Sequence, residues 1–130
     1  MLRLGYKGGA MASVLILVIE DERDILDMLR ELLEEEGHHV VCVSHPRQLT
    51  PIKEEYRPDL LFVDLMLPDL SGIELARRLR EDGFPDTPMV AMSASPDMLR
   101  SAVRSNLFQE TLPKPFDIER LLSYAERYAA

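Results

Sequence analysis

Two uninterrupted apolar runs restrict the fold more than any other feature of this sequence. Residues 14–19 read VLILVI and residues 60–63 read LLFV, without the alternation of a strand that has one face in water. Strands of this kind are covered on both faces and belong to parallel sheets flanked by helices. Carboxylates follow both runs: Glu20 and Asp21 the first, Asp64 the second. We therefore expect a buried parallel sheet with acidic side chains at one edge.

Stretches with helical periodicity separate these runs from three further strand-like segments. In residues 24–36 the apolar side chains recur at helical spacing, and Gly37 marks the expected end. The expected buried stripe is Ile25, Met28, Leu29, Leu32 and Leu33. The other expected strands are 39–43, 89–95 with Ser93 near its end, and 112–114. The other expected helices are 50–57, 72–80, 96–106 and 117–128.

Two positions in these helices are predicted from local chemistry. Thr50 followed by Pro51 suits an N-cap and a first helical residue, so the second helix is expected to begin there.

The expected buried side of the last helix is Ile118, Leu121, Leu122 and Ala125. The expected surface or strand-edge residues include Arg77, Arg78, Arg80, His38, His39 and His45.

Strand and helix alternate five times, which predicts a doubly wound α/β sandwich of five parallel strands and five flanking helices. A chain of 130 residues suits one domain, expected over residues 14–130. Residues 1–13 are expected to be a disordered leader. A signal peptide is rejected because the apolar run leads into EDERD with no small-residue cleavage site, and the run is too short to cross a membrane.

Charge and cysteine content narrow the function classes. The net charge is −8, and residues 14–93 hold 18 acidic against 8 basic residues. A chain of this charge is a poor partner for nucleic acid, whose phosphates favour Lys and Arg. Cys42 is the only cysteine, so no disulfide framework or cysteine metal cluster is expected, and a cytoplasmic location fits best.

Four polar residues are expected to meet at one crevice. Asp21, Asp64, Ser93 and Lys114 each stand at or just past the end of a different expected strand. The carboxyl ends of parallel strands converge where open α/β sheets bind their ligands. With Glu20 added, three carboxylates would crowd together, and each like-charge pair at about 4 Å costs on the order of 4 kcal/mol. Alternatively, Glu20 and Asp21 only cap a helix, and Asp64 only ends a strand.

An all-oxygen cluster favours a hard cation, and Mg²⁺ is the natural choice because it binds through one or two carboxylates and leaves positions for phosphate oxygens. The ammonium group of Lys114 and the hydroxyl of Ser93 suit a phosphoryl oxygen. The set is therefore expected to support in-line phosphoryl transfer with Asp64 as the nucleophile.

Four short segments together resemble the receiver domain of two-component response regulators. They are VIEDE at 18–22, VDLMLPDLSG at 63–72, MSA at 92–94 and LPKPF at 112–116, and the similarity covers about residues 14–128. Each segment alone is weakly specific, whereas their order and spacing are specific. The resemblance implies a flavodoxin-like, chemotaxis-regulator-like fold with strand order 2-1-3-4-5.

The resemblance also implies a role for each matching residue. Asp64 is the expected phosphoacceptor, with Ser93 and Lys114 completing the reactive site, and the bond from Lys114 to Pro115 is expected to be cis. The implied Mg²⁺ ligands are Asp21, Asp64 and the backbone carbonyl of Met66, with Glu20 acting through water. The implied phosphoryl donor is a histidine kinase or a histidine phosphotransfer protein.

One position departs from the family pattern. Thr111 stands where the family has an aromatic residue that reports phosphorylation, so the usual relay to the output surface lacks its aromatic member, and Phe108 is a candidate replacement. The expected output is a protein contact over 96–106, 112–114 and 117–128. A homodimer through this surface is one candidate, and no DNA-binding domain, nucleic acid or membrane partner is expected.

Three rival functions stay open. A phosphatase of the haloacid dehalogenase type also uses a strand-end aspartate and magnesium, but it carries a second Asp where this chain has Met66. A flavodoxin-like binding module would need a phosphate-cradling loop after the first strand, where this chain has acids. A receiver that docks without switching is compatible with Thr111.

Overall fold

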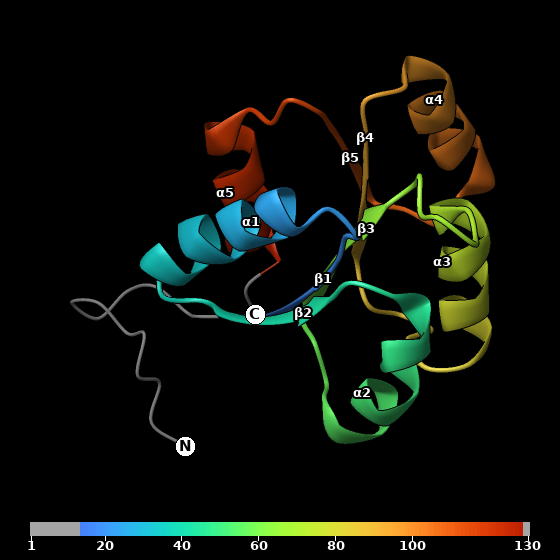
Figure 1. Cartoon of the computed structure of the whole chain (residues 1–130), viewed down its shortest axis with the longest axis horizontal. Coiled ribbons are helices and arrows are strands. Elements are labelled where there is room, and N and C mark those ends of the chain that lie inside the picture. Colours follow the sequence, from blue (N-terminus) through green and yellow to red (C-terminus); the bar gives the residue numbers. More distant parts are fainter. Residues whose placement is uncertain (1–13, 129–130) are drawn as a thin grey trace.

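The computed structural model describes residues 14–128, which form a five-stranded parallel sheet in the order β2-β1-β3-β4-β5 (Figure 1). The predicted fold class and strand order are therefore confirmed. The expected leader, residues 1–13, lies outside the described residues. The strands are β1 (Leu15–Ile19), β2 (His39–Val43), β3 (Leu60–Asp64), β4 (Met89–Ser93) and β5 (Glu110–Pro113). The helices are α1 (Arg23–Glu35), the 3-10 turn η1 (Pro46–Gln48), α2 (Leu49–Glu55), α3 (Gly72–Glu81), α4 (Pro96–Ser105) and α5 (Ile118–Arg127).

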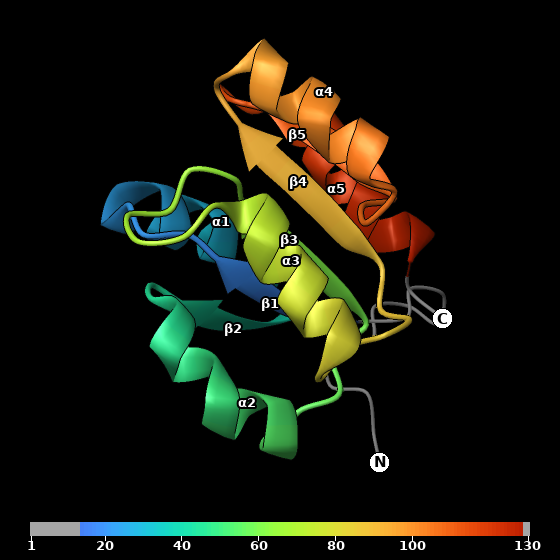
Figure 2. The ribbon, with the colours of Figure 1, turned by 90° about the vertical axis from the view of Figure 1, so that its right-hand side faces the viewer.

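The sheet is buried on both faces by two helical layers (Figures 1 and 2). Alternate strand side chains point to opposite faces, so each strand contributes to two separate parts of the core. Under α1 and α5 lie Ile16, Val18, Leu60, Phe62, Val90 and Met92. Under α2 and α3 lie Leu17, Ile19, Leu61, Val63 and Met89, and Ala102 of α4 packs on Leu65 and Ala91.

Local chemistry sets the ends of most helices. Ser71, Ser95 and Asp117 each accept a hydrogen bond from a backbone N–H group in the first turn that follows them. Gly37, with a φ of 91°, ends α1 as predicted, and Asn106 ends α4 in the left-handed region with a φ of 61°. These caps keep the segments between strands and helices short.

The predicted start of the second helix is wrong. The chain first forms η1, which the His45 side chain caps, and α2 then begins at Leu49, so Thr50 lies inside the helix. Pro51 is accommodated in the first turn of α2 because the first four N–H groups of a helix have no acceptor within it.

Two predicted core positions are also wrong. Met28 is 38% exposed and Ile118 is 49% exposed, while Leu26 and Tyr124 are buried instead. An apolar stripe predicts the period of a helix better than the phase of its buried face. The ring of Tyr124 is buried with its hydroxyl donating to the Thr111 carbonyl at 3.0 Å, so a polar tip does not keep it at the surface.

His38 and Arg80 are less exposed than the sequence suggests. His38 is buried, and its Nδ1 accepts the N–H of Val14 at 3.2 Å. The guanidinium of Arg80 lies between the α3–β4 and α4–β5 connections, and burial lowers its pKa below the ordinary value. Its acceptors are the carbonyls of Phe84, Pro85, Thr87 and Leu107 and the side-chain oxygen of Gln109.

Arg80→Met should lower the free energy of unfolding by roughly 2–4 kcal/mol, because it removes donors from carbonyls that are partly shielded from water. Urea denaturation measures this effect. Arg77→Met is the matched control, since Arg77 is exposed on the same helix and, among the described residues, its side chain pairs with Glu74 alone. Equal losses in the two variants would contradict the role given to Arg80.

Candidate functional site

The carboxyl ends of four strands bring the predicted site residues to one edge of the sheet. Glu20 and Asp21 follow β1, Asp64 is the last residue of β3, and Ser93 is the last residue of β4. Lys114 comes directly after β5, and its N–H donates to the carbonyl of Ser93 at 3.0 Å. Because the strands are parallel and in register, residues far apart in sequence end at the same level.

Three carboxylates form the centre of the site. One oxygen each from Glu20, Asp21 and Asp64 lies within 4.8 Å of the others. Glu20 is fully buried and Asp64 is 3% exposed, so water screens neither charge well. The N–H of Glu22 donates to Glu20 Oε2 and the N–H of Met66 donates to Asp64 Oδ1, both at 3.1 Å. The backbone thus holds two acids in the crowded position.

Lys114 supplies the positive charge nearest to this cluster. Its Nζ lies 2.8 Å from Glu20 Oε1 and 3.6 Å from Asp64 Oδ1, and its side chain is 14% exposed. The peptide bond to Pro115 is cis, as the resemblance implied. Lys114 therefore bridges the acid after the first strand and the acid that ends the third.

The pKa values of the two central groups move in the same direction for different reasons. Burial raises the pKa of Asp64 from 3.8 to about 7, and the charge of Glu20 adds to this, against the hydrogen bond from Met66. Burial alone would lower the pKa of Lys114, but its hydrogen bond to Glu20 and the nearby negative charges raise it. Lys114 thus stays charged, while the pKa of Asp64 lies near neutral pH when no cation is present, so part of its population is ionised there.

Ser93 completes the edge on the β4 side. It is 1% exposed, and its hydroxyl oxygen accepts the N–H of Ser95 at 3.0 Å. Within residues 14–128 its O–H group donates no hydrogen bond, so its proton is available to an acceptor that enters the crevice. In the register, Asp64 lies opposite Met92, which places Ser93 one residue beyond it.

The segment 65–71, which follows Asp64, is held in place by contacts that sequence reasoning missed. Met66 bridges to Ser71, and the N–H of Gly72 donates to the Leu65 carbonyl at 2.9 Å. A Cβ at Gly72 would lie 2.2 Å from the carbonyl oxygen of Asp64, so α3 begins against the end of β3. The only sequence signal was a glycine at the first position of a predicted helix, where glycine is not a favoured residue.

Thr111, the position that departs from the family pattern, lies on β5 away from the acidic cluster. Its carbonyl accepts from the hydroxyl of Tyr124 of α5. Phe108 is partly buried and packs against the cluster of Leu65, Ala91 and Ala102. The replacement of the usual aromatic residue by Phe108 stays a prediction.

A family model for the response regulator receiver domain matches residues 16–126. The chain therefore belongs to the response regulator receiver family, whose members are phosphoacceptor signalling domains of two-component systems and act with histidine kinases or phosphotransfer proteins.

Three similar proteins illustrate the range of this family. An uncharacterized protein encoded beside sodA1 in Leptolyngbya boryana is 33% identical over 91% of this chain and 92% of its own length. Response regulator MprA of Mycolicibacterium vanbaalenii is 34% identical over 85% of this chain but only 48% of its own, so this chain spans about half of that regulator. The receiver domain of NtrX from Brucella abortus superposes with a TM-score of 0.79 at 30% identity, over 88% of this chain and 97% of that domain.

Asp64→Asn should raise the melting temperature in the absence of divalent metal, and most of all at alkaline pH. Because folding raises the pKa of Asp64 from 3.8 to about 7, its contribution to stability is complete at acid pH and is lost as pH rises through that range. The advantage of the variant in melting temperature should therefore grow with pH. The corresponding gain in the free energy of unfolding has a ceiling of about 4 kcal/mol. Thermal melts from pH 4 to 8, with exposed Asp27→Asn as control, measure it. A gap that does not grow with pH would contradict it.

Gly72→Ala should cost roughly 3 kcal/mol or more of unfolding free energy, because the added methyl group meets the backbone of β3 rather than a flexible side chain. Ser71→Ala is the comparison, since it removes only a helix cap worth about 1 kcal/mol. Chemical denaturation of both variants provides the test. A smaller loss for Gly72→Ala than for Ser71→Ala would show that α3 can move away from Asp64 at little cost.

Proposed function

We propose that this chain accepts a phosphoryl group from a phosphohistidine donor onto Asp64. The observation that carries the proposal is the position of Asp64, a 3% exposed carboxylate beside two other acids and 3.6 Å from an ammonium group. Buried like charges without such a function would only destabilise the fold. Membership of the receiver family supports the same reading.

The reaction transfers one phosphoryl group without an added co-reactant. One carboxylate oxygen of Asp64 attacks phosphorus in line with the donor imidazole, and an O–P bond forms as the P–N bond breaks. The product is an acyl phosphate, and the leaving imidazole nitrogen, which keeps the electron pair of the P–N bond, takes up a proton from solvent water. Lys114 is placed to turn from Glu20 and Asp64 toward the arriving oxygens, and Ser93 can donate its hydroxyl proton to one of them.

The acids at this edge suit a hard divalent cation, for which we propose Mg²⁺. Within residues 14–128 the ligand atoms that gather at this edge are carboxylate oxygens, and the proposed ligands are the carboxylates of Asp21 and Asp64 with the backbone carbonyl of Met66. Glu20 is engaged by Lys114, which favours an indirect contact through water. When bound, the ion would offset the charge that accumulates on the transferred group.

An apolar hollow beside Lys114 supports docking of the donor protein at this edge. It has a volume of about 280 Å³ and is lined by Ile25 and Met28 of α1, by Lys114, Pro115 and Phe116, and by Ile118 of α5. Met28 and Ile118 are the two residues whose predicted burial was wrong, and here they border a surface next to the reactive site. Exposed apolar side chains that gather at one place mark contact surfaces.

Incubation with acetyl phosphate tests the proposal. A covalent adduct one phosphoryl group heavier should form in the presence of Mg²⁺, and much less should form in EDTA, as read by intact-protein mass spectrometry. Asp64→Ala should abolish the adduct. Asp69→Ala is the matched control, because Asp69 lies in the same segment but is exposed and pairs with His45.

The same assay separates the rivals. An adduct that persists in Asp64→Ala would refute Asp64 as the acceptor, and sustained hydrolysis of phosphate monoesters would indicate the phosphatase. A phosphatase of that type is disfavoured by Met66, which stands two residues after the nucleophile and whose side chain is 60% exposed.

A further inference from the structure

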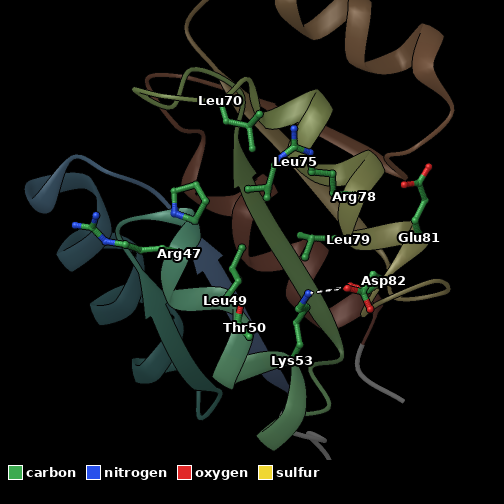
Figure 3. A pocket seen from close by; sticks show the side chains of 11 residues that line it. Arg47, Leu49, Thr50, Lys53, Leu70, Leu75, Arg78, Leu79, Glu81 and Asp82 are labelled. Atoms are coloured by element: carbon green, nitrogen blue, oxygen red, sulfur yellow. Dashed lines mark hydrogen bonds and ion pairs between the residues drawn. The ribbon is translucent and has the colours of Figure 1, made fainter.

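A second hollow lies on the other helical layer, between α2 and α3 (Figure 3). Its volume is about 460 Å³, within the range of small-molecule sites in proteins. The apolar lining is Leu49, Leu70, Leu75 and Leu79. In Figure 3 these side chains point toward a common space from α2, from α3 and from the segment before α3.

Side-chain contacts limit the length of this hollow. At one end, Lys53 of α2 reaches across to α3, with its Nζ 3.2 Å from the Asp82 carbonyl and 3.3 Å from Asp82 Oδ2. The stem of Lys53 lies over Gly83, where an added Cβ would come within 2.7 Å of it. Leu70 lies at the opposite end in Figure 3. The hollow therefore suits a compact molecule better than a helix of a partner protein lying along the groove.

One exposed arginine borders the hollow in an otherwise acidic molecule. Arg78 lies beside Leu75 in Figure 3, is 64% exposed and, among the described residues, is paired at Nε alone, 3.4 Å from Glu74. Arg47 also lines the hollow, but its guanidinium points away from the common space in Figure 3. The acids of the lining are Glu81 and Asp82, and Asp82 is paired with Lys53. Arg78 thus retains donors for an anion at the rim.

We propose that this hollow binds a small amphipathic organic anion, with a ring-sized apolar body over the four leucines and its acidic group at Arg78. A purely apolar ligand would leave the guanidinium group of Arg78 unused, and a cation would be repelled by it. The hydroxyl of Thr50, which also lines the hollow, offers a further hydrogen bond.

This site is separate from the proposed phosphoryl transfer, because it needs neither metal nor a modified Asp64. It does share the segment 65–71 with the reactive edge, since Leu70 lines the hollow and neighbouring Asp69 pairs with His45 at 3.2 Å. Binding can therefore be measured on the unphosphorylated chain, and failure of one proposal leaves the other standing.

Anilinonaphthalene sulfonate is a suitable probe, because it combines two small ring systems with one anionic group and becomes fluorescent in apolar sites. Titration of the folded chain should show saturable binding of one molecule. The uncharged analogue phenylnaphthylamine, which has the same rings without the sulfonate, should bind at least about fivefold more weakly, as expected for loss of a partly exposed charge-assisted contact.

Three variants locate the bound probe. Arg78→Gln should weaken binding about five- to tenfold, whereas Arg77→Gln should change it less than about twofold, because Arg77 shares Glu74 with Arg78 but does not line the hollow. Thr50→Trp should abolish binding by filling the space from an exposed position, with circular dichroism to check that the fold is kept.

Any of four results would overturn the proposal. They are no saturable binding, equal effects of Arg77→Gln and Arg78→Gln, unchanged binding in folded Thr50→Trp, and equal affinity for the uncharged analogue. Binding of an acidic amphipathic peptide in place of the probe would assign the hollow to a protein partner and would also overturn it.

Discussion

The structure depends on three carboxylates that the sheet forces together and one ammonium group that partly neutralises them. Glu20, Asp21 and Asp64 approach within 4.8 Å, where each pair of charges costs on the order of 4 kcal/mol before solvent softens the repulsion. Lys114, at 2.8 Å from Glu20, can offset only part of this charge. A cation bound among these carboxylates would relieve their mutual repulsion and so stabilise the folded protein. The repulsion in the free protein therefore favours binding of the ion.

The rest of the fold keeps this edge rigid without contributing chemistry to it. Strands buried on both faces leave little freedom for a change of register, because a slip by one residue would turn apolar side chains to the wrong layer. Gly72 lets α3 pack directly on the end of β3, and Arg80 joins two connections outside the reactive edge. The candidate site therefore stands on a rigid scaffold, and the unfavourable charge contacts are confined to a few acids.

The sequence predicted the sheet and the meeting of the strand ends because both follow from simple physics. Unbroken apolar runs predict strands covered on both faces, and parallel strands end together, which placed Asp21, Asp64, Ser93 and Lys114 at one edge.

Other features depend on partners that periodicity does not reveal. Arg80 looked like a solvent-facing residue, but carbonyls from two distant connections surround it. His38 is buried because the Val14 N–H needs an acceptor. The exposure of Met28 and Ile118 follows from the rotation of α1 and α5 against the sheet, which a stripe of apolar residues leaves undetermined.

The contact between Lys114 and Glu20 joins residues 94 positions apart, near opposite ends of the described chain. During synthesis on the ribosome, the acids emerge well before the lysine, and no nascent chain that stops before Lys114 holds the complete set. The capacity to receive a signal would then arise only when the last strand has added to the sheet. Damage that detaches β5 would remove Lys114 from the site, and the proposed activity would be lost although every acid is intact.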